Sequence, residues 1–109
     1  ETEREPYLMM QDVYDALKSL KARTNDKRLD MVLYAAKRVK EKLSVESDFG
    51  YGKDIVINCE NNIAKQLQFL LDIIPVADNG NIEENMKAIN TAISNINSLL
   101  RKRTELKRR

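Results

Sequence analysis

The sequence predicts an all-α fold, an antiparallel four-helix bundle made of two helical hairpins in a single domain of 109 residues. Apolar residues recur at steps of three and four along four stretches, which is the period of a helix with one buried face. The chain contains only three glycines and two prolines, whereas many short strands would need more turn residues. The connection within each pair of helices is short, so consecutive helices are expected to lie antiparallel.

The first two helices are expected at about residues 7–23 and 27–43. Pro6 lies where the first turn of a helix tolerates proline. The connection TNDK offers Asn25 as a helix stop and Asp26 as the N-cap of the second helix. The apolar faces comprise Met10, Val13, Leu17 and Leu20, then Leu29, Val32, Ala36, Val39 and Leu43. These two helices form the first predicted hairpin.

The second hairpin is expected to contain helices at about residues 55–74 and 82–106. Pro75 is predicted to end the first of them, and Asn81 to be the N-cap of the other. The β-branched run 55–57 is expected to be helical or to lead into the helix, because a lone strand would have no partner. The apolar faces comprise Cys59, Ile63, Leu67, Leu70 and Ile74, then Ile82, Met86, Ile89, Ile93, Ile96 and Leu100.

The apolar stripe of the fourth helix is long and narrow, and it resembles the seam of a coiled coil. Isoleucines at nearly every position of the stripe suit either a core within one chain or a contact between two chains. The core of the same chain is the simpler interpretation, and dimerisation through the fourth helix is the alternative that the sequence leaves open.

The segment SDFGYGKD, residues 47–54, joins the hairpins. It is not a phosphate-binding P-loop, because its glycines are too close together and Asp54 stands where the motif needs a hydroxyl. We expect a loop that reverses the chain, with its glycines at positive φ, its aromatic rings over the end of the core, and Asp54 capping the next helix. The glycines are Gly50 and Gly52, and the rings belong to Phe49 and Tyr51.

Two features of the composition exclude several kinds of chemistry. The sequence contains no histidine, which removes the Ser-His and Cys-His nucleophile systems and the commonest general base. Cys59 is the single cysteine, so the chain can form neither an internal disulfide nor a zinc site of several thiolates. We expect Cys59 to be a small buried side chain, and the protein to be non-enzymatic, without cofactor or metal.

The location of the protein is only weakly indicated by its sequence. No stretch approaches the ~20 apolar residues of a membrane span, and no signal-peptide pattern opens the chain. The cysteine usage suits a reducing compartment, so we expect a cytoplasmic protein. Because the chain begins at Glu1 without a methionine, we also expect it to be a processed or excerpted part of a longer protein.

The formal net charge of +2 conceals an uneven distribution of charge. Six of the last nine residues, 101–109, are basic and one is acidic, and without them the chain would be acidic. The second helix is rich in lysine and arginine, whereas the region 46–78 is acidic, so we expect the second and third helices to be complementary neighbours. The basic end is typical of a helix C-terminus, and it also suits contact with phosphates or an acidic partner.

These observations predict a non-catalytic interaction module, a small adaptor or assembly subunit, that binds a protein partner or a second copy of itself through its helix faces. The candidate contact residues are Tyr7, Met9, Tyr34 and Phe69, which lie at or near the edges of the apolar stripes.

Two alternatives remain open. In the first, the chain is an accessory nucleic-acid-binding protein whose basic end contacts phosphates without reading bases. The cations for that role are Arg101, Lys102, Arg103, Lys107, Arg108 and Arg109. In the second, the bundle binds a small ligand in a cavity. Steep salt dependence would distinguish the nucleic-acid alternative from binding through apolar surface.

Overall fold

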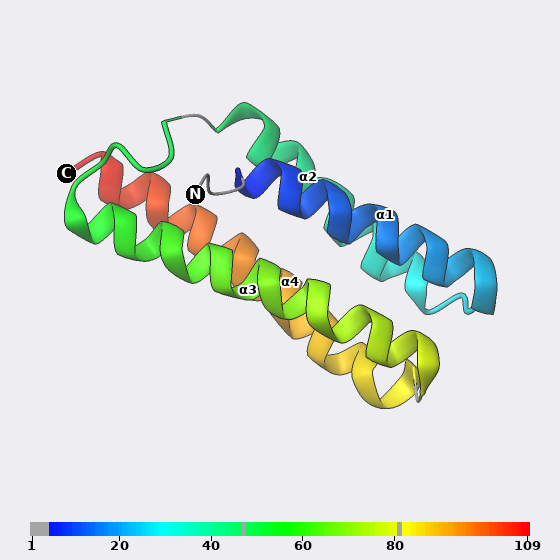
Figure 1. The fold of residues 1–109 in the computed structure, drawn as a ribbon. Helices are drawn as coiled ribbons and strands as arrows, with labels where there is room; N and C mark the ends of the chain where they lie inside the picture. Colours follow the sequence, from blue (N-terminus) through cyan, green and yellow to red (C-terminus); the bar gives the residue numbers. More distant parts are fainter. Residues whose placement is uncertain (1–4, 47, 81) are drawn as a thin grey trace.

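The computed structural model describes residues 5–46, 48–80 and 82–109, and it confirms an all-α four-helix bundle. The helices are α1 (Pro6–Thr24), α2 (Leu29–Val45), α3 (Asp54–Asn79) and α4 (Ile82–Lys107). No strand occurs among the described residues. The bundle is elongated, with extents of 44 × 29 × 21 Å (Figure 1).

The four helices form a ring of neighbours. α1 packs on α2 and α3 packs on α4, and the two pairs meet through contacts of α1 with α3 and of α2 with α4. The remaining pairs, α1 with α4 and α2 with α3, lie across the diagonals, so the connection 46–53 crosses one end of the bundle (Figure 1). Arg28 meets Glu83 at one end, and Glu46 meets Arg103 at the other, so α2 and α4 run in the same direction.

The apolar stripes predicted from the sequence form the core. Each residue of the predicted faces of α1 and α2 is buried, and so are the predicted positions of α3 and those of α4 from Met86 to Leu100. A smaller apolar cluster of Val56, Cys59 and Leu106 lies where the last turns of α4 meet the start of α3. The expectation that Cys59 is a buried small side chain is therefore confirmed, and its thiol donates a hydrogen bond to the carbonyl of Leu99 at 3.2 Å.

The prediction that Pro75 ends the third helix is wrong, because α3 continues through Pro75 to Asn79. Pro75 is on the exposed side of the helix, while Ile74 and Ala77 are 3% and 2% exposed. The packing of these buried residues holds the last turn in helical form despite the hydrogen bond that proline cannot donate. Asn81, the predicted cap of α4, lies outside the described residues.

The turn between α1 and α2 follows its sequence closely. Asn25 adopts the left-handed conformation, with φ of 54°, and its backbone N–H donates to the carbonyl of Lys21 at 2.7 Å. The prediction that Asn25 stops α1 is thus confirmed. Asp26 accepts a hydrogen bond from the backbone N–H of Arg28 at 2.9 Å, and α2 begins at Leu29 rather than at residue 27. The prediction that Asp26 is the N-cap is therefore wrong, because Arg28 occupies that position and the carboxylate of Asp26 orders a turn that precedes the helix.

The glycines of the connection have two different roles. Gly50 has φ of +90°, as predicted. The prediction of positive φ at Gly52 is wrong, and Asp48 occupies the other left-handed position, with φ of 58°. A Cβ on Gly52 would lie 2.9 Å from the Cγ1 atom of Val56, so a glycine is needed there for close approach.

The rings and the cap of this connection also differ from expectation. Phe49 packs against the core as predicted, whereas Tyr51 is 86% exposed, so the prediction that its ring covers the core is wrong. Lys53 occupies the N-cap position of α3 and Asp54 is the first helical residue, so Asp54 is not the cap. Phe49 is the ring that packs here, and it also lies over the guanidinium of Arg103, with 4.0 Å between the guanidinium carbon and the ring centroid.

Candidate interaction surface

Arg103 is the centre of an ion cluster at the end of the bundle that the connection 46–53 crosses. The ion cluster comprises Arg103 and Lys107 of α4, Glu60 of α3, and Glu46 and Asp48 of the connection. The side chain of Arg103 is 0% exposed. Its Nε donates to Glu60 Oε2 at 2.7 Å, and its terminal nitrogens donate to Glu46 at 2.5 Å and to Asp48 at 3.2 Å. Three carboxylates from two segments therefore bind one guanidinium.

The ion cluster fixes the connection to both helices of the second hairpin. The second oxygen of Glu60 accepts a hydrogen bond from the backbone N–H of Gly50 at 2.8 Å, so both of its oxygens have partners. Burial alone would lower the pKa of Arg103, but hydrogen bonds to Glu60 and Asp48 outweigh it and raise that pKa. The guanidinium is thus held as a cation although its own side chain is fully buried.

This arrangement separates the six cations of the basic end into two groups, one within the ion cluster and one outside it. Arg103 is buried, so its guanidinium does not face an external phosphate, in contrast to the sequence expectation. Lys107 Nζ lies 3.1 Å from Asp48 Oδ2, and its hydrogen bond, together with that of Arg103, lowers the pKa of Asp48 despite partial desolvation. The exposed cations of the predicted set that lie outside the ion cluster are Arg101, Lys102, Arg108 and Arg109.

A signal for the burial of Arg103 was present in the sequence. The apolar stripe of α4 passes through Ile96 and Leu100, and the same steps of three and four continue to Arg103 and then to Leu106. Arg103 therefore occupies a core position of the fourth helix. Arg101 and Lys102 directly precede it, and residues 107–109 are all basic, which hid it among exposed cations.

The four candidate partner-contact residues do not form one surface. Met9 is in the core at 9% exposure, and Tyr7 is half-buried against that core, so neither is a free apolar side chain. Tyr34 on α2 is 64% exposed and Phe69 on α3 is 42% exposed. Only this last pair therefore fits the expectation of exposed rings, and they lie on helices that do not contact each other.

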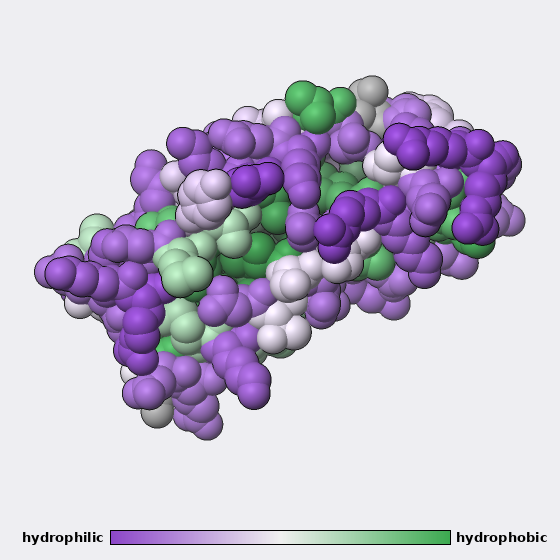
Figure 2. Space-filling view, turned by 180° about the vertical axis from the view of Figure 1, so that it is seen from behind, coloured by the Kyte–Doolittle hydropathy of each residue, from purple (hydrophilic) through white to green (hydrophobic). Residues whose placement is uncertain are grey.

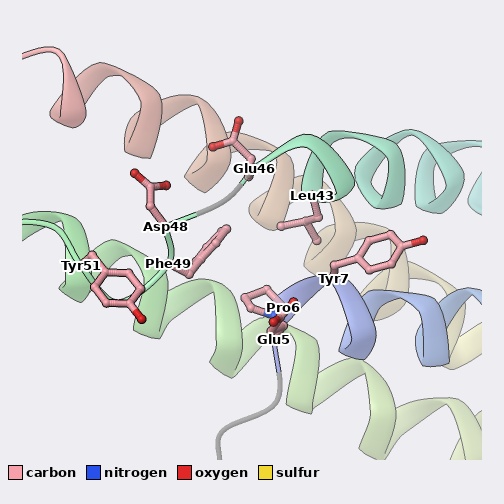
Figure 3. A pocket seen from close by; sticks show the side chains of 8 residues that line it. All are labelled: Glu5, Pro6, Tyr7, Leu43, Glu46, Asp48, Phe49 and Tyr51. Carbon is pink, nitrogen blue, oxygen red and sulfur yellow. The ribbon is translucent and has the colours of Figure 1, made fainter.

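A recess of about 290 Å³ lies beside the connection, at the start of α1 (Figure 3). Tyr7, Leu43 and Phe49 contribute rings and an aliphatic side chain to its wall. The carboxylates of Glu46 and Asp48 point toward α4 in this view and pair with Arg103. The recess is therefore lined by both apolar and acidic side chains, and two of its acidic groups already have a cation.

A longer groove runs between α2 and α4. Its central part is a hollow of about 570 Å³, with a floor of Val39 and Ile93, each 2% exposed. Figure 2 views the molecule from behind, where α2 and α4 face the reader, and it shows hydrophobic surface in a depression flanked by hydrophilic side chains. A hollow of about 190 Å³ beside Val45 continues this α2–α4 groove toward Thr104, and another of about 560 Å³ adjoins the groove on the face of α2.

Residue size explains why the α2–α4 groove stays open. The wall contributed by α4 carries short polar side chains at helical spacing, Asn90, Ser94 and Asn97, which cannot reach across Ile93. The wall contributed by α2 carries exposed apolar side chains beside the groove, and these are Tyr34 (64%) and Val45 (78%). The α4 wall therefore consists of short polar side chains, whereas the α2 wall consists of longer side chains that are partly apolar.

The walls of the α2–α4 groove are positively charged. The lining cations are Lys37, Arg38, Lys42 and Arg101, and the lining carboxylates are Glu41 and Glu46. Glu46 is already paired with Arg103. Arg38 donates to Tyr34 Oη at 3.3 Å and lies over its ring, and this hydrogen bond raises the pKa of Arg38. Lys42 Nζ donates to Asn97 Oδ1 across the groove.

This charge is not neutralised within the bundle in the way that the sequence suggested. The prediction that the basic second helix and the acidic third helix are neighbours is wrong, because α2 and α3 lie across a diagonal. The acidic residues of the connection pair instead with Arg103 and Lys107 of α4. The cations on the outer face of α2 are therefore left to face solvent beside the groove.

Comparisons with protein-family models, with curated proteins and with solved structures find no match to this chain. Within residues 5–46, 48–80 and 82–109, no helix is both long enough and apolar enough to cross a membrane. The same residues contain no cluster of three or more acidic or cysteine side chains arranged to hold a metal ion. Function is therefore inferred from the surface itself.

Proposed function

We propose that the chain is a non-catalytic helical interaction module that binds a protein partner along the α2–α4 groove. The observation that carries this proposal is the apolar floor of Val39 and Ile93 in a hollow of about 570 Å³ on the outer face. A groove of this kind between two helices is a common docking place for another protein segment. The exposed ring of Tyr34 at its edge is the type of anchor that interfaces favour.

The shape of the α2–α4 groove supports a protein partner over a small ligand. Sites for small molecules usually enclose most of the ligand surface. This groove is open to solvent, and an adjoining hollow extends it past Val45 to Thr104, beyond the point where Lys42 bonds Asn97 across it. A long open groove with an apolar floor suits a long segment of a partner protein better than a compact small molecule.

Photo-crosslinking in cells that express the protein tests this function. A benzoylphenylalanine residue would replace Tyr34 at the edge of the α2–α4 groove, or Phe69 on α3 as the matched control. We expect discrete crosslinked products of higher mass from position 34 and not from position 69. We also expect Ser94→Trp, which fills the groove from an exposed position of α4, to abolish the products from position 34.

Two results would contradict the proposal. One is the absence of products from position 34 when the protein is present at its normal level. The other is an unchanged set of products after the Ser94→Trp substitution. Thermal unfolding of the variant would show first that the bundle is intact. Products with the mass of two copies of this chain would identify self-association as the function of the groove.

Phosphate binding by the basic end is the second candidate function. The observation in its favour is that four of the six predicted cations are exposed and lie outside the ion cluster, and they are Arg101, Lys102, Arg108 and Arg109. A group of four exposed cations can contact a phosphate backbone without reading its sequence. Titration with nucleic acid, argued below, tests this candidate.

A further inference from the structure

The occupant of the α2–α4 groove can be deduced from its shape and charge, and this deduction rests on the function proposed above. From Tyr34 to Val45 the groove follows α2 for about 17 Å, which is about three turns of helix at 1.5 Å per residue. Its walls are two helices that run in the same direction. A third helix laid along them can insert its side chains into the space between the two walls.

The apolar part of the groove limits what the partner presents. The buried floor is narrow, formed by Val39 and Ile93 with Ala35 beside them. A helix meets such a floor with one stripe of apolar residues at positions i, i+3 or i+4, and i+7. The flanks of the same helix then face the polar wall of Asn90, Ser94 and Asn97 on one side and the α2 wall on the other.

The charge of the groove walls determines which side chains are favourable on the flanks of that helix. The cations lining the groove outnumber the carboxylates, and Glu46 is already paired with Arg103. The neighbours of α2 in the bundle are α1 and α4, so no acidic helix covers these cations. Glutamate or aspartate on the flanks of a partner would complement them and steer its approach.

A second copy of this chain is a poorer occupant. In a twofold dimer the same patch meets itself, so the lysine and arginine side chains of one α2 would face those of the other. Like charges placed opposite each other oppose association. We infer that the α2–α4 groove receives an amphipathic helix of another protein, about three turns long, with one apolar stripe and acidic flanks.

A displayed peptide library tests this inference with the full chain as the target. The library would contain helical peptides of about 18 residues with leucine, isoleucine or phenylalanine at one stripe and all residue types elsewhere. We expect selection to enrich aspartate and glutamate on the flanks. The affinity of an enriched peptide should fall at least tenfold in the double variant Lys37→Glu/Arg38→Glu and in Ser94→Trp, but stay within twofold in the control Lys65→Glu on α3.

The possible results separate this inference from the function on which it rests. Enriched peptides with neutral or basic flanks that still depend on Ser94 would overturn the acidic partner and leave the groove as a docking site. A library without any groove-dependent peptide, combined with crosslinks from position 34, would overturn the helical partner alone. If the library yields no groove-dependent peptide and position 34 yields no crosslinks, both the helical partner and the proposed function are overturned. Displacement of an enriched peptide by an oligonucleotide of equal affinity would assign the basic face to phosphate instead.

Discussion

At the scale of single residues, Arg103 has the largest consequences, because a buried charge is tolerated only when its neighbours match it. Its planar guanidinium donates to three carboxylates and stacks on Phe49 at the same time. A lysine could not reproduce this, since its ammonium is a point charge without a planar face. The ion cluster therefore determines which cation of the basic end faces inward.

Replacing Arg103 by leucine should destabilise the bundle strongly. The substitution leaves Glu60, 6% exposed, as an uncompensated buried carboxylate, and breaking a buried pair in this way costs about 3–5 kcal/mol. The double variant Arg103→Leu/Glu60→Leu should recover much of that loss, because both charges are then absent. Urea unfolding of the three proteins measures the effect. Equal stability of the single and double variants would show that the pairing with Glu60 is not the cause.

Asp26 gives a prediction about acid. Hydrogen bonds from the side chain and backbone of Arg28 lower the pKa of Asp26 from 3.8 to about 2. Because the folded-state pKa is depressed, the stabilisation from this carboxylate is present above pH 3.8 and is lost as the pH falls toward 2. An NMR titration should find the low pKa in the native chain and a higher pKa in Arg28→Gln, raised only part of the way to the ordinary value because the backbone N–H of residue 28 still donates. A value unchanged by that substitution would refute the assigned cause.

At the scale of elements, the sequence was most informative about where helices lie and which face each buries. α2 and α4 illustrate this, because their buried positions follow the same spacing. These positions are Leu29, Val32, Ala36, Val39 and Leu43 in α2, and Met86, Ile89, Ile93, Ile96 and Leu100 in α4. Periodicity reports the burial of each helix separately, so these faces could be predicted without knowing which helix covers them.

Periodicity does not report which helices are neighbours, and the errors follow from that. The pairing expected between α2 and α3 fails because the connection crosses the end of the bundle diagonally. The ion cluster joins Arg103 to Glu60 and to residues of that connection, so it depends on the same long-range arrangement. The α2–α4 groove was likewise hidden, although Tyr34 at its edge was identified as a candidate contact.

Pro75 offers a test of how tertiary packing prolongs α3. Pro75 is exposed and lies inside the helix, where proline removes a backbone hydrogen bond and costs up to about 3 kcal/mol in an isolated helix. Pro75→Ala should therefore increase the free energy of unfolding by about 1–2 kcal/mol, since alanine restores the donor but frees the unfolded chain. The neighbouring exposed substitution Val76→Ala is the matched control and should change stability by less than about 0.5 kcal/mol. Urea unfolding measures both, and a destabilised Pro75→Ala protein would contradict the prediction.

At the scale of the whole molecule, charge is separated between two surfaces. The acidic connection neutralises Arg103 and Lys107 at the end of α4, whereas the cations of α2 line the open groove. The remaining exposed cations of the basic end lie on the last two turns of α4 and just beyond them. Apart from Arg101, which also lines the groove, the protein and nucleic-acid candidates use different residues, so substitutions can distinguish them.

Removal of residues 101–109 would be a poor test of phosphate binding, because it also deletes the buried side chains of Arg103 and Leu106. A better variant changes to glutamine only the exposed cations that lie outside both the ion cluster and the α2–α4 groove. The substitutions are Lys102→Gln, Arg108→Gln and Arg109→Gln, and Arg101 is kept because it also lines the groove. Far-UV circular dichroism and thermal unfolding should show that this variant keeps the native fold, since none of its changes is buried.

Fluorescence anisotropy with labelled single- and double-stranded DNA and RNA then compares the two proteins at about 50 and 200 mM salt. If the α2–α4 groove is the functional surface, the native chain should bind nucleic acid only weakly at the lower salt and not measurably at the higher. Four phosphate contacts limit the salt dependence on duplex DNA to a slope of about −3.6 in log K against log salt. The glutamine variant keeps Arg101 and should lose most of this residual binding, while an acidic groove peptide binds it within twofold of the native affinity. Submicromolar binding that persists at 200 mM salt and disappears in the variant would instead make phosphate recognition by the basic end the main function.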